Sequence, residues 1–283
     1  MSSQTTLTST LPLNNTIPIP RLHLGVYQVS GRACSSAVTF ALEAGYRAID
    51  SAEWYGNEKE VGDSINAFLE KHGEVKREDV WFTTKLQNNV GYEDTRRKIK
   101  ASVKRCGLGY VDLYLLHSPI GGTRKRLECW RAVGDAIEEG EVRAGGVSNF
   151  GVRHLQELLD SNPKVKPAVN QIEVHPFNTQ TAITDLCKKN DIIVEAYAPL
   201  ARAMRAKHPK VVELSKKYNC TWAQLLIKWS LQNGFVPLPK SVKQERVVSN
   251  ADVDGFSIEE ADLQALRALD EHLVTDWDPT DVD

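Results

Sequence analysis

From about residue 22 onward, short apolar runs alternate along the chain with longer stretches in which apolar residues recur every three to four positions. The short runs are typical of buried strands, and the longer spacing is typical of amphipathic helices. Val152, Leu155 and Leu158 show the helical spacing, and Thr221 is a candidate N-cap for a second such helix. Eight runs predict strands, at residues 23–27, 46–50, 80–85, 111–117, 142–148, 168–172, 192–197 and 235–239.

Eight strand–helix units in series predict a single (β/α)8 barrel of the TIM type, because right-handed crossovers close such units into a parallel sheet. An open doubly wound sheet is the competing α/β fold. It normally carries G-x-G-x-x-G after its first strand, and no such motif occurs here. No linker-like segment divides the chain, so we expect one domain over residues 1–283. Residues 1–20, with two extended runs separated by Pro12, predict a β-hairpin that closes the barrel bottom.

Charge and cysteine content exclude several classes of protein. Lys and Arg number 35 and Asp and Glu number 37, so the net charge of −2 gives no field that would attract nucleic acid or an acidic membrane. The 5 cysteines are dispersed without a C-x-x-C pair, which predicts reduced thiols and no metal site. The N-terminus lacks the pattern of a signal peptide, and no apolar run approaches the ~18 residues of a membrane helix. We therefore expect a cytoplasmic protein.

Common catalytic motifs of other enzyme classes are incomplete in this chain. Gly140 and Gly145 have the P-loop spacing, but Gly146 stands in place of the lysine. The segment 146–150 lacks the second glycine of a nucleophile elbow, and no H-E-x-x-H motif occurs. ATPase, α/β-hydrolase and zincin functions lose support.

Polar residues follow or end most of the predicted strands. The carboxyl ends of parallel strands in a barrel lie on one rim, where catalytic groups of this fold are found. We therefore expect one rim to collect Asp50, Lys85, His117, Ser148, Asn149, Gln171, Tyr197 and Lys240.

Six segments in chain order resemble the aldo-keto reductase family, and the resemblance extends from about residue 13 to the end. They are Gly45 to Ala52 with Tyr55 to Glu58 and Gly62, Thr84 to Leu86, Leu116 to Pro119, Gly146 to Phe150, Asn170 to Glu173, and Leu238 to Ser241 with Arg246. The resemblance implies a short-loop, microbial-type reductase that transfers hydride from NADPH to an aldehyde or ketone. It also implies a catalytic set of Asp50, Tyr55, Lys85 and His117.

The chemistry of these four residue types fits carbonyl reduction. A carbonyl oxygen gains negative charge as its carbon accepts hydride, so it needs a proton donor. Tyr55 would be that donor, and we expect the ammonium of Lys85 to lower the pKa of its phenol from about 10. Asp50 would hold Lys85 charged and oriented. His117 would hydrogen-bond the carbonyl oxygen.

The cofactor residues come from the same resemblance. Ser148, Asn149 and Gln171 would hold the nicotinamide amide, and Tyr197 would stack on its ring. Lys240, Ser241 and Arg246 would bind a 2′-phosphate, which favours NADPH over NADH because an ammonium and a guanidinium suit a dianion. Leu200, Val242 and Asn250 complete the predicted cofactor contacts.

Substrate breadth is predicted from aromatic residues and loop lengths. Tyr27, Trp54 and Trp277 would wall the pocket, and the segments 118–125 and 198–207 are short. An open aromatic pocket predicts activity on activated carbonyls, dicarbonyls and ketoesters. Two alternatives stay open, a Schiff-base lyase using Lys85 and an NADPH-binding sensor with little turnover. We expect a monomer, with a homodimer as the alternative, and a small-molecule carbonyl as the only partner.

Overall fold

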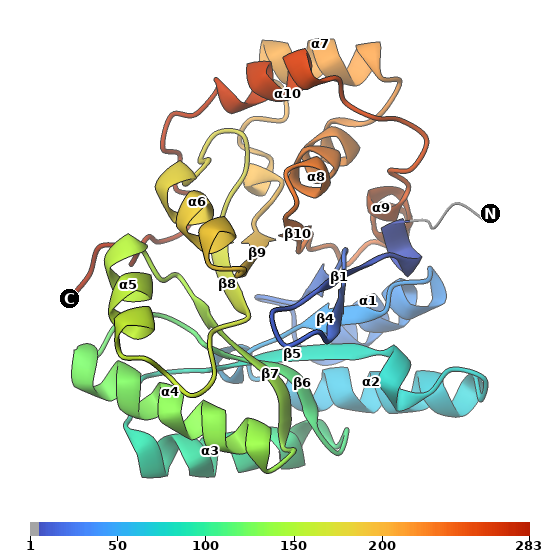
Figure 1. Ribbon diagram of the computed structural model, residues 1–283. Coiled ribbons are helices and arrows are strands. Elements are labelled where there is room, and N and C mark those ends of the chain that lie inside the picture. The colour runs from blue at the N-terminus through green and yellow to red at the C-terminus, as the bar shows by residue number, and fades with distance from the viewer. Residues whose placement is uncertain (1–5) are drawn as a thin grey trace.

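The computed structural model describes residues 6–283 and contains an eight-stranded parallel sheet (Figure 1). Adjacent strands along the chain pair with each other from β3 through β10. The amides of His23 and Gly25 then donate to the carbonyls of Pro237 and Pro239, both at 3.2 Å, which joins the last strand to the first. The predicted (β/α)8 barrel is confirmed. The strands are β3 (Leu24–Gly25), β4 (Ala48–Asp50), β5 (Trp81–Leu86), β6 (Val111–Leu116), β7 (Val142–Ser148), β8 (Val169–Glu173), β9 (Ile193–Tyr197) and β10 (Val236–Pro237).

Helices surround the sheet and cover its outer face (Figure 1). Leu155 and Leu158 are buried, as their spacing predicts, but Val152 in the first turn of the same helix is 44% exposed. Thr221 caps its helix by accepting the amide of Gln224 at 3.2 Å. The helices are α1 (Gly31–Glu43), α2 (Glu58–Lys71), α3 (Tyr92–Cys106), α4 (Thr123–Glu138), α5 (Val152–Asp160), α6 (Thr181–Lys189), α7 (Pro209–Lys217), α8 (Trp222–Gln232), α9 (Gln244–Ala251) and α10 (Glu260–Arg267), with single 3₁₀ turns η1 (Thr6–Thr8), η2 (Glu53–Tyr55), η3 (Arg77–Asp79) and η4 (Ala201–Ala203).

A hairpin closes one end of the barrel, as predicted. Strands β1 (Thr10–Pro12) and β2 (Pro18–Pro20) are antiparallel. Ile19 is fully buried and clusters with Leu113 and Leu115 from inside the barrel. The turn of the hairpin lies after Pro12, which ends β1 rather than separating the two runs. Residues 1–5 of the predicted segment lie outside the described part of the chain.

Close contact between α2 and α3 depends on one glycine. A Cβ atom built at Gly62 would lie 1.7 Å from the carbonyl oxygen of Cys106, which no side chain tolerates. The absence of a side chain at Gly62 therefore allows α2 to pack against the end of α3. All 5 cysteines are free thiols, as predicted.

Candidate active site

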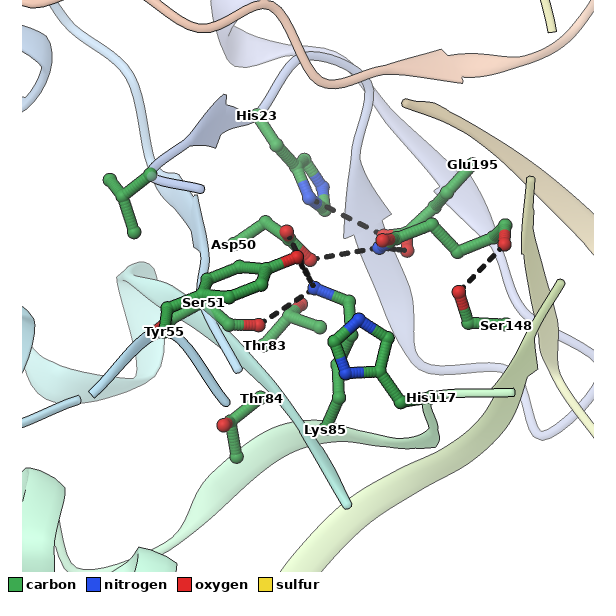
Figure 2. Close-up of polar contacts among 12 residues, drawn as sticks. His23, Asp50, Ser51, Tyr55, Thr83, Thr84, Lys85, His117, Ser148 and Glu195 are labelled. Carbon is green, nitrogen blue, oxygen red and sulfur yellow. Dashed lines mark hydrogen bonds and ion pairs between the residues drawn. The ribbon is translucent and has the colours of Figure 1, made fainter. Parts of the chain in front are cut away.

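Four predicted catalytic residues converge at the carboxyl ends of β4, β5 and β6 (Figure 2). Asp50 ends β4, Lys85 lies in β5, and His117 follows the last residue of β6. Tyr55 ends the turn η2 that leads from β4 to α2. Ring centroids of Tyr55 and His117 are 5.7 Å apart. The structure therefore places all four side chains in one cluster.

Lys85 is the centre of this cluster. Its Nζ donates to Oδ1 of Asp50 and to the carbonyl of Ser51, both at 2.7 Å, and lies 3.5 Å from Oη of Tyr55. The Lys85 side chain is fully buried and that of Asp50 is 5% exposed. A buried ion pair is retained only with good geometry and further hydrogen bonds, and this pair has both. Lys85 is thus held as an ammonium that points at the Tyr55 phenol.

The turn carrying Tyr55 is held by a buried amide. Asn57 accepts from Oγ of Ser51 at 2.6 Å and donates to the carbonyls of Val26 and Val29 at 3.0 and 2.7 Å. These bonds tie the start of α2 to the segment after β3. Since Tyr55 lies between Ser51 and Asn57, its position relative to Lys85 is restrained from both sides.

The direction of the pKa shift of Tyr55 differs from the sequence-based expectation. Burial and the nearby Asp50 carboxylate raise the pKa of the Tyr55 phenol well above its usual value, so the expected lowering by Lys85 is wrong for this structure. The Asp50 carboxylate lies 2.7 Å from the Lys85 ammonium and neutralises it, so the ammonium does not produce the expected lowering of the phenol's pKa. The phenol consequently keeps its proton at neutral pH, which is the form that can donate.

His117 is neutral in this environment. Burial and the Lys85 ammonium lower its pKa to about 3. Its Nδ1 is buried and has no hydrogen-bond partner within residues 6–283. The ring packs edge-on against Trp54, with centroids 5.9 Å apart. A neutral imidazole at this place can offer one N–H donor without adding positive charge beside Lys85.

The polar residues predicted to hold a nicotinamide lie next to the cluster, on β7, β8 and β9. Asn149 has a left-handed backbone (φ 59°), a conformation that Asn tolerates. Its amide donates to the carbonyl of His117 at 3.0 Å and its Oδ1 accepts from Oη of Tyr197 at 2.8 Å. Ser148 Oγ donates to the carbonyl of Gln171 at 2.9 Å. These side chains orient one another on one side of the site.

The predicted phosphate-binding residues lie on the segment after β10 and on α9. Lys240, Val242 and Arg246 are exposed, and Ser241 is half-buried. Neither Lys240 nor Arg246 pairs with a carboxylate in the part of the chain that the structure describes. Asn250 is buried in α9, and Leu200 is partly buried after β9. Of these two cations, Arg246 lies in the first turn of α9, whereas the ammonium of Lys240 lies 5.9 Å from the ring centroid of Tyr27.

The family follows from comparison with known proteins. A sequence model of the aldo/keto reductase family matches residues 24–271. The chain belongs to this family. An uncharacterized oxidoreductase of Schizosaccharomyces pombe is 47% identical over 96% of this chain and 98% of its own length. The glyoxal reductase of Bacillus subtilis is 39% identical over 94% of each chain.

Solved structures agree with the family assignment. An aldo-keto reductase from a Medee basin deep-sea metagenome library superposes with a TM-score of 0.90 at 38% identity, covering 97% of this chain and all of the other. The Bombyx mori aldo-keto reductase in complex with NADP gives 0.88 at 32% identity, covering 94% of each. This aldo-keto reductase is accordingly an oxidoreductase. Within residues 6–283, none of its helices is long and apolar enough to cross a membrane.

Two of the three predicted pocket aromatics lie beside the candidate catalytic residues and are exposed to solvent. Tyr27 is 36% exposed and its ring centroid is 5.0 Å from that of Tyr55, while Trp54 is 58% exposed beside His117. Trp277 lines a small hollow with Asn149 and Tyr197, so it lies on the side of the predicted nicotinamide residues. In this aldo-keto reductase, Tyr27 and Trp54 are therefore exposed aromatic rings in contact with Tyr55 and His117.

Residues that sequence reasoning missed also surround the site. Arg202 pairs with Asp276 at 2.7 Å, which links the turn η4 to the C-terminal segment, and Arg202 has a left-handed backbone. Glu195 and His23 are fully buried behind Asp50. The sequence does contain a signal for Glu195. Side chains of a strand alternate between its two faces, so this charged residue, two positions before Tyr197 in an apolar strand, must lie on the same face as Tyr197. Nothing in the local sequence points to His23.

Proposed function

We propose that this protein reduces aldehydes and ketones with NADPH, with Tyr55 as the proton donor. The observation that carries the proposal is the position of the Lys85 ammonium, 2.7 Å from Asp50 and 3.5 Å from the Tyr55 phenol. The names of two relatives agree, since one is a glyoxal reductase and another was solved with NADP. The competing lyase reaction needs a neutral amine, whereas Lys85 is held as an ammonium by Asp50 and Ser51.

The donor set after β10 fits a phosphorylated dinucleotide. Lys240 and Arg246 have no carboxylate partner in the described chain, and unpaired N–H groups open the helix α9 nearby. Lys240, Ser241 and Arg246 would hold the 2′-phosphate, and Val242, Asn250 and Leu200 would contact the rest of the cofactor. Ser148, Asn149, Gln171 and Tyr197 would orient the nicotinamide. When bound, NADPH supplies the hydride that the carbonyl carbon accepts.

The chain's own residues would manage the proton and the substrate. The Tyr55 Oη–H donates to the carbonyl oxygen as charge develops there, and the Lys85 ammonium stabilises the phenolate left behind. Asp50 keeps Lys85 protonated and oriented. The neutral His117 hydrogen-bonds the same carbonyl oxygen and orients it, a task that does not require an imidazolium.

Substrates would be activated carbonyls with flat or compact groups, including aromatic aldehydes, 1,2-dicarbonyls and ketoesters. The segment between β6 and α4 has only residues 117–122, and the exposed rings of Tyr27 and Trp54 form the mouth. Aromatic walls with few polar anchors discriminate weakly, because one methylene changes binding by only about 1–3 kcal/mol. Hydrophilic open-chain sugars would therefore be poor substrates.

A panel of carbonyl compounds, followed by the loss of NADPH absorbance, tests this function. Turnover of several aromatic aldehydes and dicarbonyls is the expected result. Tight NADPH binding with no turnover on any carbonyl would instead indicate a cofactor-sensing protein. A sugar whose kcat/KM exceeded that of every aromatic aldehyde by about a hundredfold would contradict the open-pocket reading, because methylene-scale contacts cannot produce that ratio.

A further inference from the structure

Two buried titratable side chains lie behind the candidate site and are not among its proposed catalytic residues. Glu195 lies on β9 and His23 precedes β3, and both side chains are fully buried. His23 Nδ1 and Glu195 Oε1 are 3.4 Å apart (Figure 2). Neither atom has another hydrogen-bond partner within residues 6–283. A buried polar pair of this kind costs free energy unless a proton lies between the two atoms.

The tautomer of His23 follows from its other nitrogen. His23 Nε2 is 3.0 Å from the carbonyl oxygen of Pro20. A carbonyl can only accept a hydrogen bond, so Nε2 carries the hydrogen. Burial, followed by the positive charge of Lys85, lowers the pKa of His23 to about 3, although the bond to Pro20 opposes this shift. The ring is therefore neutral, and Nδ1 faces Glu195 as an acceptor.

Glu195 then has to supply the hydrogen. An ionised carboxylate would set two lone pairs against each other at Oε1 and Nδ1, whereas a protonated carboxyl can donate to Nδ1. Burial, together with the negative charge of Asp50, raises the pKa of Glu195 to about 8. Tautomer geometry and electrostatics thus agree that the pair contains one proton at neutral pH.

Gln171 connects this pair to the candidate catalytic residues. Its Nε2 donates to Oε2 of Glu195 and to Oδ2 of Asp50, both at 2.8 Å. An amide nitrogen has two hydrogens, so both are used and the Gln171 side chain is locked between two carboxyl groups. The other oxygen of Asp50 accepts from Lys85. A continuous chain of contacts therefore runs from His23 through Glu195, Gln171 and Asp50 to Lys85.

We propose that Glu195 and His23 share one proton at neutral pH and act as positioning residues, which hold Gln171 and through it Asp50 behind Lys85 and Tyr55. The positioning part rests on the proposed function, whereas the location of the proton does not. Loss of the proton would place a second negative charge next to Asp50 and leave His23 and Glu195 in repulsive contact. Carbonyl reduction should then fall as the pH rises through the ionisation of Glu195.

Among residues 6–283, the charged or titratable groups facing Glu195 come from three neighbouring elements. His23 approaches from the segment before β3, Asp50 from β4 and Lys85 from β5. Gln171 on β8 is neutral and favours the ionised form through its N–H, but burial and Asp50 outweigh it. Lys85 also favours ionisation of Glu195, but its effect on the pKa is smaller than those of burial and Asp50, which raise it.

Infrared spectroscopy of the wild-type protein tests where the proton is. A carboxylic-acid C=O band should persist at pH 7, when ordinary carboxyls are ionised, and should disappear near pH 8. Glu195→Gln should remove this band, because the amide keeps the shape but carries no acid. Glu213→Gln, the same change at an exposed site on α7, should leave the band in place. Absence of the band in the wild-type protein at pH 7 would overturn the proposal without any variant having to fold.

Kinetics test the positioning role. Glu195→Gln can accept from Gln171 and donate to His23, so kcat/KM at pH 7 should stay within about threefold of wild type, while the decline near pH 8 should vanish. Glu195→Ala removes the acceptor and should lower kcat/KM by about tenfold or more. An unchanged pH profile in Glu195→Gln would overturn the coupling to Asp50. A wild-type protein that reduces no carbonyl would refute the proposed function, and the infrared result would still decide the location of the proton.

Discussion

The Lys85 ammonium lies 2.7 Å from Oδ1 of Asp50, and both side chains are buried at the carboxyl ends of adjacent strands. Asp50 is not a passive counter-ion, because it both neutralises Lys85 and raises the pKa of the neighbouring Tyr55. The pair therefore lies beside a phenol that keeps its proton at neutral pH. This state is the one that a proton donor needs before it reacts.

Replacing Tyr55 by Phe removes the proposed proton donor and little else. We expect reduction to slow by about 10²–10⁴-fold, the usual contribution of a general acid, with NADPH affinity nearly unchanged. Stopped-flow or steady-state kinetics and a fluorescence titration with NADPH would measure the two quantities. Tyr92→Phe, which removes a phenol bonded to Asp135 on the outer surface, should behave like wild type. A Tyr55→Phe enzyme with near wild-type kcat would exclude this residue as the donor.

His117→Ala tests orientation of the substrate. The imidazole packs edge-on against both Trp54 and Tyr55, so its loss should raise KM for bulky carbonyls by more than for small aldehydes. His272→Ala, at an exposed position of the C-terminal segment, provides the control. Equal kinetics for His117→Ala and wild type on both substrate sizes would reduce His117 to a packing role.

The protonation of His117 gives a separate pH prediction. Its pKa is lowered to about 3 by burial and Lys85, so the ring stays neutral from pH 7 down to pH 5. Any step near pH 6.5 in the wild-type kcat/KM profile should therefore remain in His117→Ala. A wild-type step at that pH which vanishes in the variant would mean that the imidazole is charged in the working enzyme.

Arg246→Ala tests coenzyme choice. Arg246 has no carboxylate partner in the described chain and lies in the first turn of α9. Its removal should weaken NADPH by about 1.5–3 kcal/mol, the range for hydrogen bonds to charged groups, and leave NADH nearly unchanged. Arg97→Ala, an exposed arginine on α3, is the matched control. If both coenzymes weakened equally, Arg246 would contact a part of the dinucleotide that NADH and NADPH share.

The strand order and most strand positions follow from the sequence because each strand is a short segment rich in apolar residues between two helical patterns. The strand at 235–239 is shorter than predicted, and only Val236 and Pro237 belong to β10. Proline has no N–H to donate, so Pro237 and Pro239 limit the ladder. Their carbonyls still accept from His23 and Gly25, which is how the barrel closes.

The protonation of the site could not be predicted in the same way. Sequence motifs place an ammonium near Tyr55, and that alone suggests a lowered pKa for the phenol. Burial and Asp50 reverse the sign, and both depend on packing in three dimensions. Likewise, the contact between His23 and Glu195 joins residues that are far apart along the chain and meet only because the barrel closes.

The proton assigned to Glu195 also predicts how stability depends on pH. The usual pKa of this carboxyl is 4.5 and burial with Asp50 raises it to about 8 in the folded protein. Between these pH values the unfolded chain loses the proton and the folded chain keeps it, so this residue's contribution to stability is full below pH 4.5 and is lost as pH rises to about 8. Glu195→Gln has no such dependence. Its free energy of unfolding, relative to wild type, should increase with pH by up to about 1.4 kcal/mol per unit.

Urea unfolding at pH 5, 6, 7 and 8 measures this difference directly. Glu213→Gln changes an exposed carboxyl paired with Lys210, and its difference from wild type should stay nearly constant over the same range. The effects of titrating groups that do not interact with Glu195 cancel in the comparison, because the two proteins differ at one position. If the curves of Glu195→Gln and wild type ran parallel from pH 5 to pH 8, Glu195 would have an ordinary pKa in the folded protein. Its carboxylate would then lie ionised against His23, and the shared proton would be excluded.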